Sequence, residues 1–103
     1  MRNFEEYVEL EKILGHAAAW SALGQLFAES SDNELEAFLA TATHTHLAQL
    51  SDDSLLYARA TVRASAYGRR FETPHIVVFE DAITNILVAR HGLADVGAFT
   101  AGT

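Results

Sequence analysis

The chain contains a nearly uninterrupted apolar run, ILGHAAAWSALGQLFA, which extends from Ile13 to Ala28. Only His16, Ser21 and Gln25 place polar side chains in it. A helix that is apolar on nearly every side has to be buried. A membrane-spanning helix needs about 20 apolar residues, and this run is shorter. We therefore predict that it forms the central buried helix of a small helical protein.

Small side chains recur at helical spacing within this run, at Gly15, Ala18, Ala19 and Ala22. Because residues at this spacing share one side of a helix, they would let a second helix approach closely. The other sides are apolar as well, and three neighbouring helices cannot cover all of them. One side is therefore expected to meet a second chain, which predicts a homodimer.

Capping residues and apolar periodicity mark two helices in the first half of the chain. The first is predicted from about Asn3, which can cap it, to Ala28. Ser31 and Glu34 form an S-x-x-E capping box, which is typical of a helix start. The second helix is predicted to begin there and to end by Leu50.

Two more helices are predicted in the second half. The cluster SDD at 51–53 can cap a third helix and complement its dipole, and Gly68 suits the left-handed residue that closes it. Thr73 is the predicted cap of the fourth helix and Pro74 its first residue, a position where proline is preferred. Gly92 is placed to end it.

One segment of the fourth helix has two interpretations. The run HIVVF at 75–79 is short and apolar enough to be a buried strand. The cap before it and the helical period that continues to Arg90 favour a helix. The sequence thus predicts an all-α fold, a compact four-helix bundle with short loops. Residues 1–103 would form this single domain, with 93–103 as a docked or frayed tail.

Charge is distributed unevenly along a chain whose net charge is −7. Residues 1–53 carry ten of the 14 acidic residues and two of the seven basic ones. Such a surface repels nucleic acid, whose binding depends on phosphate neutralisation. It is either a solvated surface that favours solubility or a surface that suits a protein partner with a basic surface. The absence of cysteine excludes disulfides and thiolate zinc sites. The acidic N-terminal sequence is unlike a secretory signal, so a cytoplasmic location is expected.

Five carboxylates have a spacing that suits a metal site. Glu5, Glu6 and Glu9 read E-E-x-x-E, and Glu29 and Asp32 read E-x-x-D. Two such pairs on facing helices could hold Mg²⁺ through oxygen ligands. The spacing is similar to that of the all-helical nucleoside triphosphate pyrophosphohydrolases of the MazG-like family. That resemblance implies metals bound by these residues that act on phosphates. The alternative is a set of acids that complement helix dipoles.

A second short motif is R-x-x-x-x-H, formed by Arg70 and His75. It resembles the motif of the HEPN ribonucleases, helical proteins in which Arg and His from paired protomers flank the scissile phosphate. The resemblance implies that the arginine would stabilise phosphate charge and that the histidine would move a proton. The alternative is an arginine in a loop and a histidine in the first turn of a helix.

No strong catalytic, metal or cofactor constellation occurs, so no metal and no cofactor are expected. The leading hypothesis is a small acidic protein that acts as a protein-binding or regulatory module through an exposed apolar and acidic surface. Aromatic residues suit such interfaces. The alternative is an enzyme like the metal-dependent pyrophosphohydrolases, with Glu5, Glu6, Glu9, Glu29 and Asp32 as its metal site. The predicted interface residues are Trp20, Tyr57, Tyr67, Phe71 and Phe99.

Overall fold

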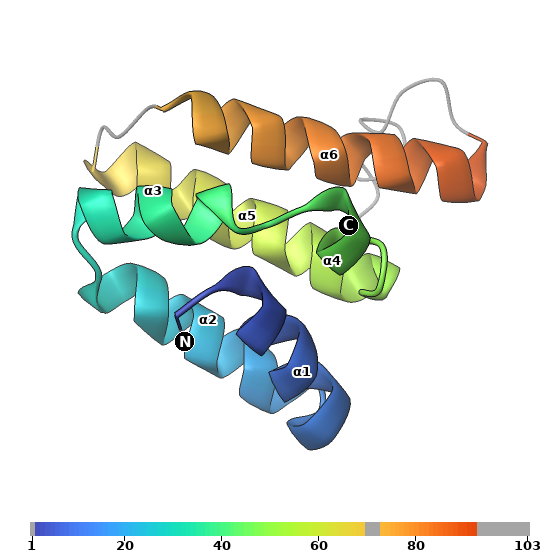
Figure 1. Cartoon of the computed structure of the whole chain (residues 1–103), viewed down its shortest axis with the longest axis horizontal. Coiled ribbons are helices and arrows are strands. Elements are labelled where there is room, and N and C mark those ends of the chain that lie inside the picture. Colours follow the sequence, from blue (N-terminus) through green and yellow to red (C-terminus); the bar gives the residue numbers. More distant parts are fainter. Residues whose placement is uncertain (1, 70–72, 93–103) are drawn as a thin grey trace.

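The computed structural model describes residues 2–69 and 73–92, and the predicted tail at 93–103 lies outside them. Within the described ranges the regular structure consists of six helices and no strand (Figure 1). The all-α class is therefore confirmed, but the number of helices is not four, because two of the predicted helices are broken. The helices are α1 (Phe4–Leu14), α2 (His16–Glu29), α3 (Asp32–Ala40), α4 (His44–Leu47), α5 (Asp52–Arg69) and α6 (Pro74–His91).

The three longest helices pack in the order α2, α5, α6. Helix α1 folds back against α2, and the two form a hairpin at one side of the molecule (Figure 1). Helices α3 and α4 both contact α6, and α4 also contacts α1. The short α4 therefore joins the hairpin to the opposite side of the fold.

The predicted first helix is wrong, because the chain turns at Gly15. Its φ of 87° and ψ of 174° separate α1 from α2, and glycine adopts such a positive φ without steric cost. The turn lets α1 bury its own apolar side against the rest of the chain. The run from Ile13 is consequently not a central buried helix: residues 13–18 are all exposed, Ile13 to 75%. Of α2, only Ala19, Leu23 and Phe27 are buried.

The predicted second helix is also broken, at residues 41–43. Its predicted start is confirmed, since Ser31 and Glu34 form both bonds of a capping box. The hydroxyl of Thr41 then donates to the carbonyl of Phe38 at 2.6 Å and accepts from the backbone N–H of Phe4 at 2.8 Å. Threonine is a poor helix former, and here its hydroxyl bonds to the backbone instead.

The helices of the second half follow the sequence signals more closely. Helix α5 begins at Asp52, and α6 begins at Pro74, so residues 75–79 are helical as favoured. Gly92 ends α6 with a φ of 65°, in the left-handed conformation. One expectation is wrong: Gly68 does not end its helix, because α5 continues to Arg69.

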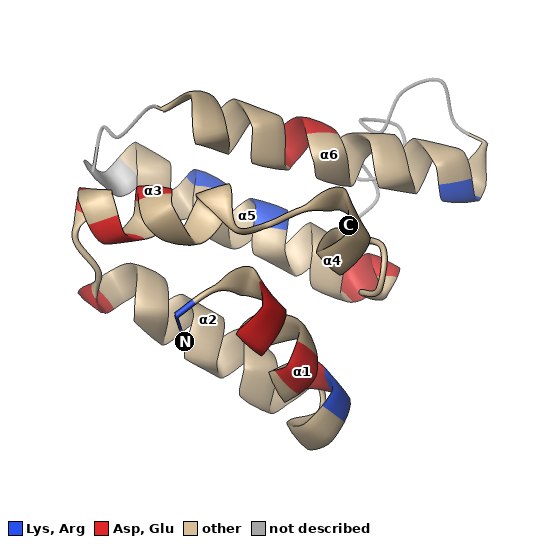
Figure 2. Ribbon diagram, viewed as in Figure 1, with Lys and Arg blue, Asp and Glu red and all other residues tan. Residues whose placement is uncertain are grey.

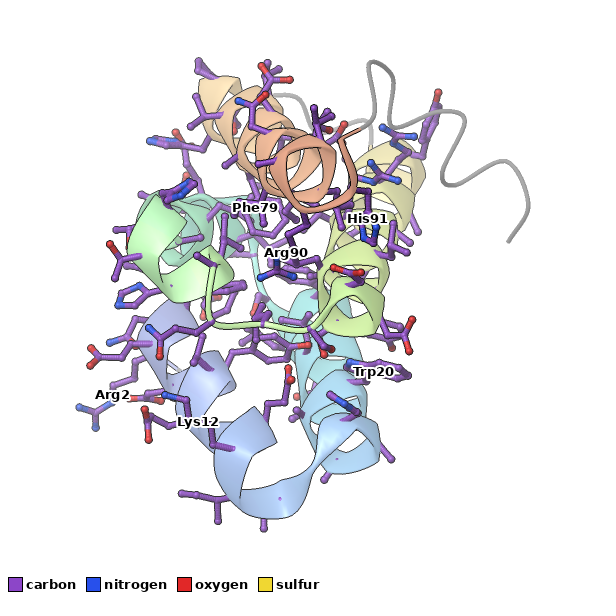
Figure 3. The ribbon with its side chains drawn as sticks, turned by 90° about the vertical axis from the view of Figure 1, so that its right-hand side faces the viewer. Arg2, Lys12, Trp20, Phe79, Arg90 and His91 are labelled. Carbon is purple, nitrogen blue, oxygen red and sulfur yellow. The ribbon has the colours of Figure 1, made fainter. Side chains whose placement is uncertain are left out.

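Apolar side chains from all six helices form one core. At its centre the fully buried ring of Phe4 lies 5.2 Å from that of Tyr7 and 5.7 Å from those of Phe38 and Phe79. These contacts join α1 to α3 and α6. Figure 3 shows Phe79 pointing from α6 into this core. The residues of the core are Phe4, Tyr7, Val8, Ala19, Leu23, Phe27, Leu35, Phe38, Leu39, Leu47, Leu50, Leu55, Ala58, Val62, Ile76, Phe79, Ile83, Ile86 and Leu87.

Polar contacts fasten the end of α6 to the start of α5 (Figure 3). Arg90 donates to Asp52 Oδ1 and to the carbonyl of Ala48, both at 2.9 Å, and His91 Nε2 lies 2.6 Å from Asp52 Oδ2. The hydrogen bond from Arg90 holds the pKa of the Asp52 carboxyl below its ordinary value. A depressed pKa means that these contacts stabilise the fold above the ordinary Asp pKa of about 3.9. That stability is lost as the pH falls through the lower folded value.

Candidate functional site

The five predicted metal ligands lie on three helices. Glu5, Glu6 and Glu9 are exposed on α1, Glu29 ends α2, and Asp32 begins α3 (Figure 2). Several of these carboxylates have partners within their own chain, and Glu29 accepts from the side-chain amide of Gln25 at 3.2 Å. Glu6 accepts from the backbone N–H of Arg2 at 2.9 Å, and Glu9 lies 3.4 Å from the ammonium of Lys12. Among the described residues, no group of three His, Asp or Glu side chains could hold a metal ion.

The predicted R-x-x-x-x-H pair is described only in part. Arg70 lies outside the described residues, whereas His75 stands in the first turn of α6. Its Nδ1 is 3.2 Å from Glu36 Oε1, so it bridges α6 to α3. His46 is half-buried, and its Nδ1 lies 3.3 Å from the carbonyl of Thr41. Both imidazoles therefore contact neighbouring segments of their own chain.

Two of the predicted interface aromatics contact each other. The rings of Trp20 and Tyr57 stack 4.8 Å apart with an interplanar angle of 10°, and Tyr57 Oη donates to the carbonyl of Trp20 at 3.3 Å. The imidazole of His16 stacks on Trp20 at 5.6 Å. Tyr67 is 81% exposed. The remaining two predicted residues, Phe71 and Phe99, lie outside the described part of the chain.

A polar cluster beneath this stack was not predicted. His16 Nδ1 lies 3.1 Å from both Glu11 Oε1 and Ser54 Oγ, and Trp20 Nε1 donates to Ser54 Oγ at 3.3 Å. A catalytic serine relay needs the hydroxyl and the carboxylate on opposite imidazole nitrogens. Here both meet the same nitrogen, and Ser54 is fully buried. The cluster is therefore a link between the hairpin and α5, and it cannot act as a nucleophilic relay in this arrangement.

Sequence reasoning missed this cluster because Glu11 and His16 are five residues apart. In one continuous helix that spacing points the two side chains in different directions. The turn at Gly15 brings them within 3.1 Å of each other. A glycine between two helix-forming segments was the signal that could have suggested it.

The hydroxyl of Tyr7 is buried in the same region without a hydrogen-bond partner, as is Glu11 Oε2. Burial raises the pKa of the Tyr7 phenol well above its ordinary value, and the negative charge of Glu11 raises it further. Hydrogen bonding toward Ser54 and Trp20 counters part of that rise, although the Tyr7 hydroxyl meets no partner at full hydrogen-bond geometry. The phenol therefore stays neutral, and its desolvation opposes folding.

Tyr7→Phe is expected to raise the free energy of unfolding by about 1 kcal/mol, because it removes a buried polar group that has no partner. Tyr57→Phe is the matched control. It deletes a hydroxyl that donates to a carbonyl, so it should lower the free energy of unfolding by about 0.5–1.5 kcal/mol. Urea denaturation measures both. A loss of stability in Tyr7→Phe would show that its hydroxyl does have a partner in solution.

The outward side of α1 carries an unusual combination of side chains. Glu5, Glu9 and Ile13 follow one another at intervals of four residues, and Glu6 stands beside them. All four residues are exposed, Ile13 to 75%. We call these four residues the acidic face of α1, and Figure 2 shows its negative charges on that helix. Apart from it, the large apolar residues that are exposed in the described part of the chain are Leu14, Tyr67, Val77 and Val78.

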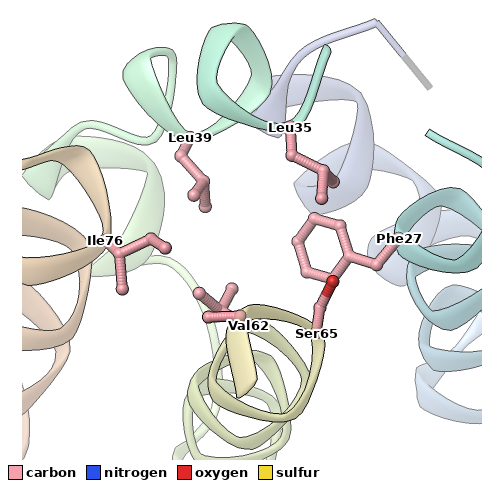
Figure 4. A pocket seen from close by; sticks show the side chains of 7 residues that line it. Phe27, Leu35, Leu39, Val62, Ser65 and Ile76 are labelled. Carbon is pink, nitrogen blue, oxygen red and sulfur yellow. The ribbon is translucent and has the colours of Figure 1, made fainter. Parts of the chain in front are cut away.

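A small apolar hollow lies between α2, α3, α5 and α6 (Figure 4). Its cavity volume is about 10 Å³, far below the 300–1,000 Å³ of typical ligand pockets. Only one of its lining residues, Ser65, carries a polar side chain, so the hollow lacks the converging polar groups of a binding site. The lining residues are Phe27, Leu35, Leu39, Val62, Ser65, Ala66 and Ile76.

Comparison of the chain with protein-family models, with curated proteins and with solved structures found no match. A search of the described helices for one that is both long and apolar enough to cross a bilayer also found none. The class of protein that the structure defines is therefore the all-α one, and the acidic face of α1 is its candidate functional site.

Proposed function

We propose that this protein is a non-enzymatic helical module that binds another protein through the acidic face of α1. The observation that carries the proposal is the position of Ile13, which is 75% exposed and follows Glu5 and Glu9 on the outward side of the helix. An isoleucine so exposed contributes little to the core of its own chain, and burying it against a partner would release about 25 cal/mol for each Å² of apolar surface.

A short amphipathic helix with lysine or arginine followed by a large apolar residue is the partner that fits this face. From Glu5 to Ile13 the face extends about 12 Å, which is slightly more than two helical turns. Helix α1 and the segments after it belong to the half of the chain that carries ten acidic and two basic residues. Complementary charge would steer a basic segment to the surface, and the apolar contact would supply affinity.

Fluorescence anisotropy with a labelled helical peptide of lysine and leucine at matching spacing tests the proposal. Ile13→Ser is expected to weaken binding by about tenfold or more, which corresponds to about 1.4 kcal/mol. Val77→Ser is the matched control, because Val77 is also apolar and 60% exposed but lies on α6. Equal affinities for the two variants would contradict the assignment of the surface to α1.

The contribution of charge is tested with a second matched pair. Glu9→Gln removes a carboxylate from the acidic face of α1, and Asp81→Asn removes an exposed one from α6. Only Glu9→Gln should slow association and reduce its dependence on salt. If both variants respond alike, the peptide senses net charge rather than this face. If both variants bind the peptide as well as the wild type does, and the wild type self-associates, the acidic face of α1 binds a second copy of the chain.

A further inference from the structure

The turn between α1 and α2 leaves helical hydrogen bonds unmade. Helix α1 ends at Leu14 and α2 begins at His16, so Gly15 is the single residue between them. Two backbone bonds cross the junction, from Gly15 N–H to the carbonyl of Glu11 at 2.9 Å and from Ala19 N–H to that of Gly15 at 3.2 Å. The N–H groups of residues 16–18 make no such bond to the carbonyls of 12–14, and α2 has no side-chain cap.

A continuous helix would pair all six of these groups. It requires only that Gly15 change from its φ of 87° to right-handed helical dihedrals. The sequence supports such a helix, because no proline occurs between Phe4 and Glu29 and most residues there are helix formers. Two states of one glycine are thus available: a hairpin that buries α1 on its own chain, and a straight helix that carries α1 away from it.

We propose that two copies of this chain exchange α1 through the straightened hinge and form a domain-swapped dimer. Each contact that α1 makes with its own chain can form between the same two residues in different copies. They include the ring of Phe4 against Phe38 and Phe79, and the bond from Lys12 Nζ to Gln49 Oε1 at 2.7 Å. Only the hinge differs between the two states, which is why exchange of an element is a low-cost route to a dimer.

The side chains that flank the hinge suit a second copy. Leu14, Ala17, Ala18 and Ser21 are all exposed in the hairpin, and Leu14 is 59% exposed. In a straight helix their spacing of three and four residues places them on one side. Small and apolar side chains there would let the two straightened hinges pack against each other. The proposal does not rest on the proposed function, because the acidic face of α1 stays on the outward side of that helix in both states.

Light scattering across a wide range of protein concentration tests the exchange. The wild type should pass from the monomer mass of 11.3 kDa to twice that mass as the concentration rises. Gly15→Ala disfavours the positive φ of the hairpin, and each dimer would relieve two such hinges. The variant should therefore dimerise at a concentration at least about thirtyfold lower than the wild type, a change of about 2 kcal/mol in the free energy of dimerisation. Gly24→Ala, a substitution within α2, should leave the transition unchanged. A Gly15→Ala protein that remains monomeric throughout would overturn the proposal.

An engineered disulfide distinguishes exchange from simple side-by-side association. The chain contains no cysteine. The backbone N–H of Phe4 bonds to Thr41 Oγ1, so residues 3 and 41 lie on adjoining segments, and Asn3→Cys with Thr41→Cys introduces one thiol on each. After oxidation, both fractions are compared on a non-reducing gel. The monomer fraction should contain internally bridged chains, and the dimer fraction should contain covalently linked pairs of chains. Thr41→Cys alone is the control and should give neither bridge. Internally bridged chains in the dimer fraction would show closed hairpins and disprove the exchange.

Discussion

Phe4→Ala is expected to lower the free energy of unfolding by about 3–5 kcal/mol, the usual cost of emptying a buried aromatic site. Phe4 is fully buried, and its ring lies within 5.7 Å of those of Phe38 and Phe79. It is the first residue of α1 and joins that helix to α3 and α6. The truncation therefore removes apolar contacts among three helices at once and leaves a cavity between them.

Urea denaturation followed by circular dichroism and by the fluorescence of Trp20, the single tryptophan, measures this loss. Coincident transitions would confirm that the hairpin unfolds together with the rest of the domain. Val77→Ala is the control, because Val77 is 60% exposed and a surface truncation should change stability by less than about 0.5 kcal/mol. An equally small effect of Phe4→Ala would mean that α1 is not docked on the core in solution.

Gly15→Ala is expected to destabilise the monomer by about 1–3 kcal/mol, because its φ of 87° and ψ of 174° belong to a region that only glycine adopts readily. The cause is the backbone, since an added Cβ would meet no atom within 4 Å. The row of small side chains had predicted a close helix approach at Gly15, and no such approach occurs there. Overpacking applies instead to Ala19, which is fully buried.

Gly24→Ala is the matched control in the same hairpin and should stabilise the protein by up to about 1 kcal/mol. Gly24 lies inside α2, and its added Cβ would stand 3.5 Å from Tyr57 Oη, an ordinary contact. Thermal and urea unfolding compare the two variants. A low protein concentration keeps both monomeric, so that exchange of α1 does not mask the change in stability. Opposite signs are expected, and a stabilised Gly15→Ala monomer would contradict the strained turn.

Structural features that depend only on near neighbours in the sequence were predicted correctly. The capping box of Ser31 and Glu34, the start of α6 at Pro74 and the left-handed Gly92 all depend on bonds or dihedrals within one helical turn. The apolar face of α6 was also predicted, because Ile76, Phe79, Ile83, Ile86 and Leu87 recur at helical spacing and are all buried.

The polar cluster at His16 and the aromatic stack at Trp20 depended on contacts that span much of the chain. Ser54 and His16 are 38 residues apart, and the stacked rings of Trp20 and Tyr57 are 37 apart. Sequence spacing carries no information about such pairs until the turn at Gly15 is known. The exposed position of Ile13 was missed for the same reason, because a continuous apolar helix at that point predicts burial.

The sequence by itself determined that this chain is all-α, where α3 and α6 begin, and that its first half is acidic, since each of these properties follows from composition or from bonds between close neighbours. Only the tertiary structure decided whether Gly15 and Thr41 would continue a helix or end one. Glycine is compatible with both backbone states, and the choice depends on burying Phe4 and on its N–H, which donates to a hydroxyl 37 residues away. Long-range burial therefore selected the hairpin from two locally acceptable conformations.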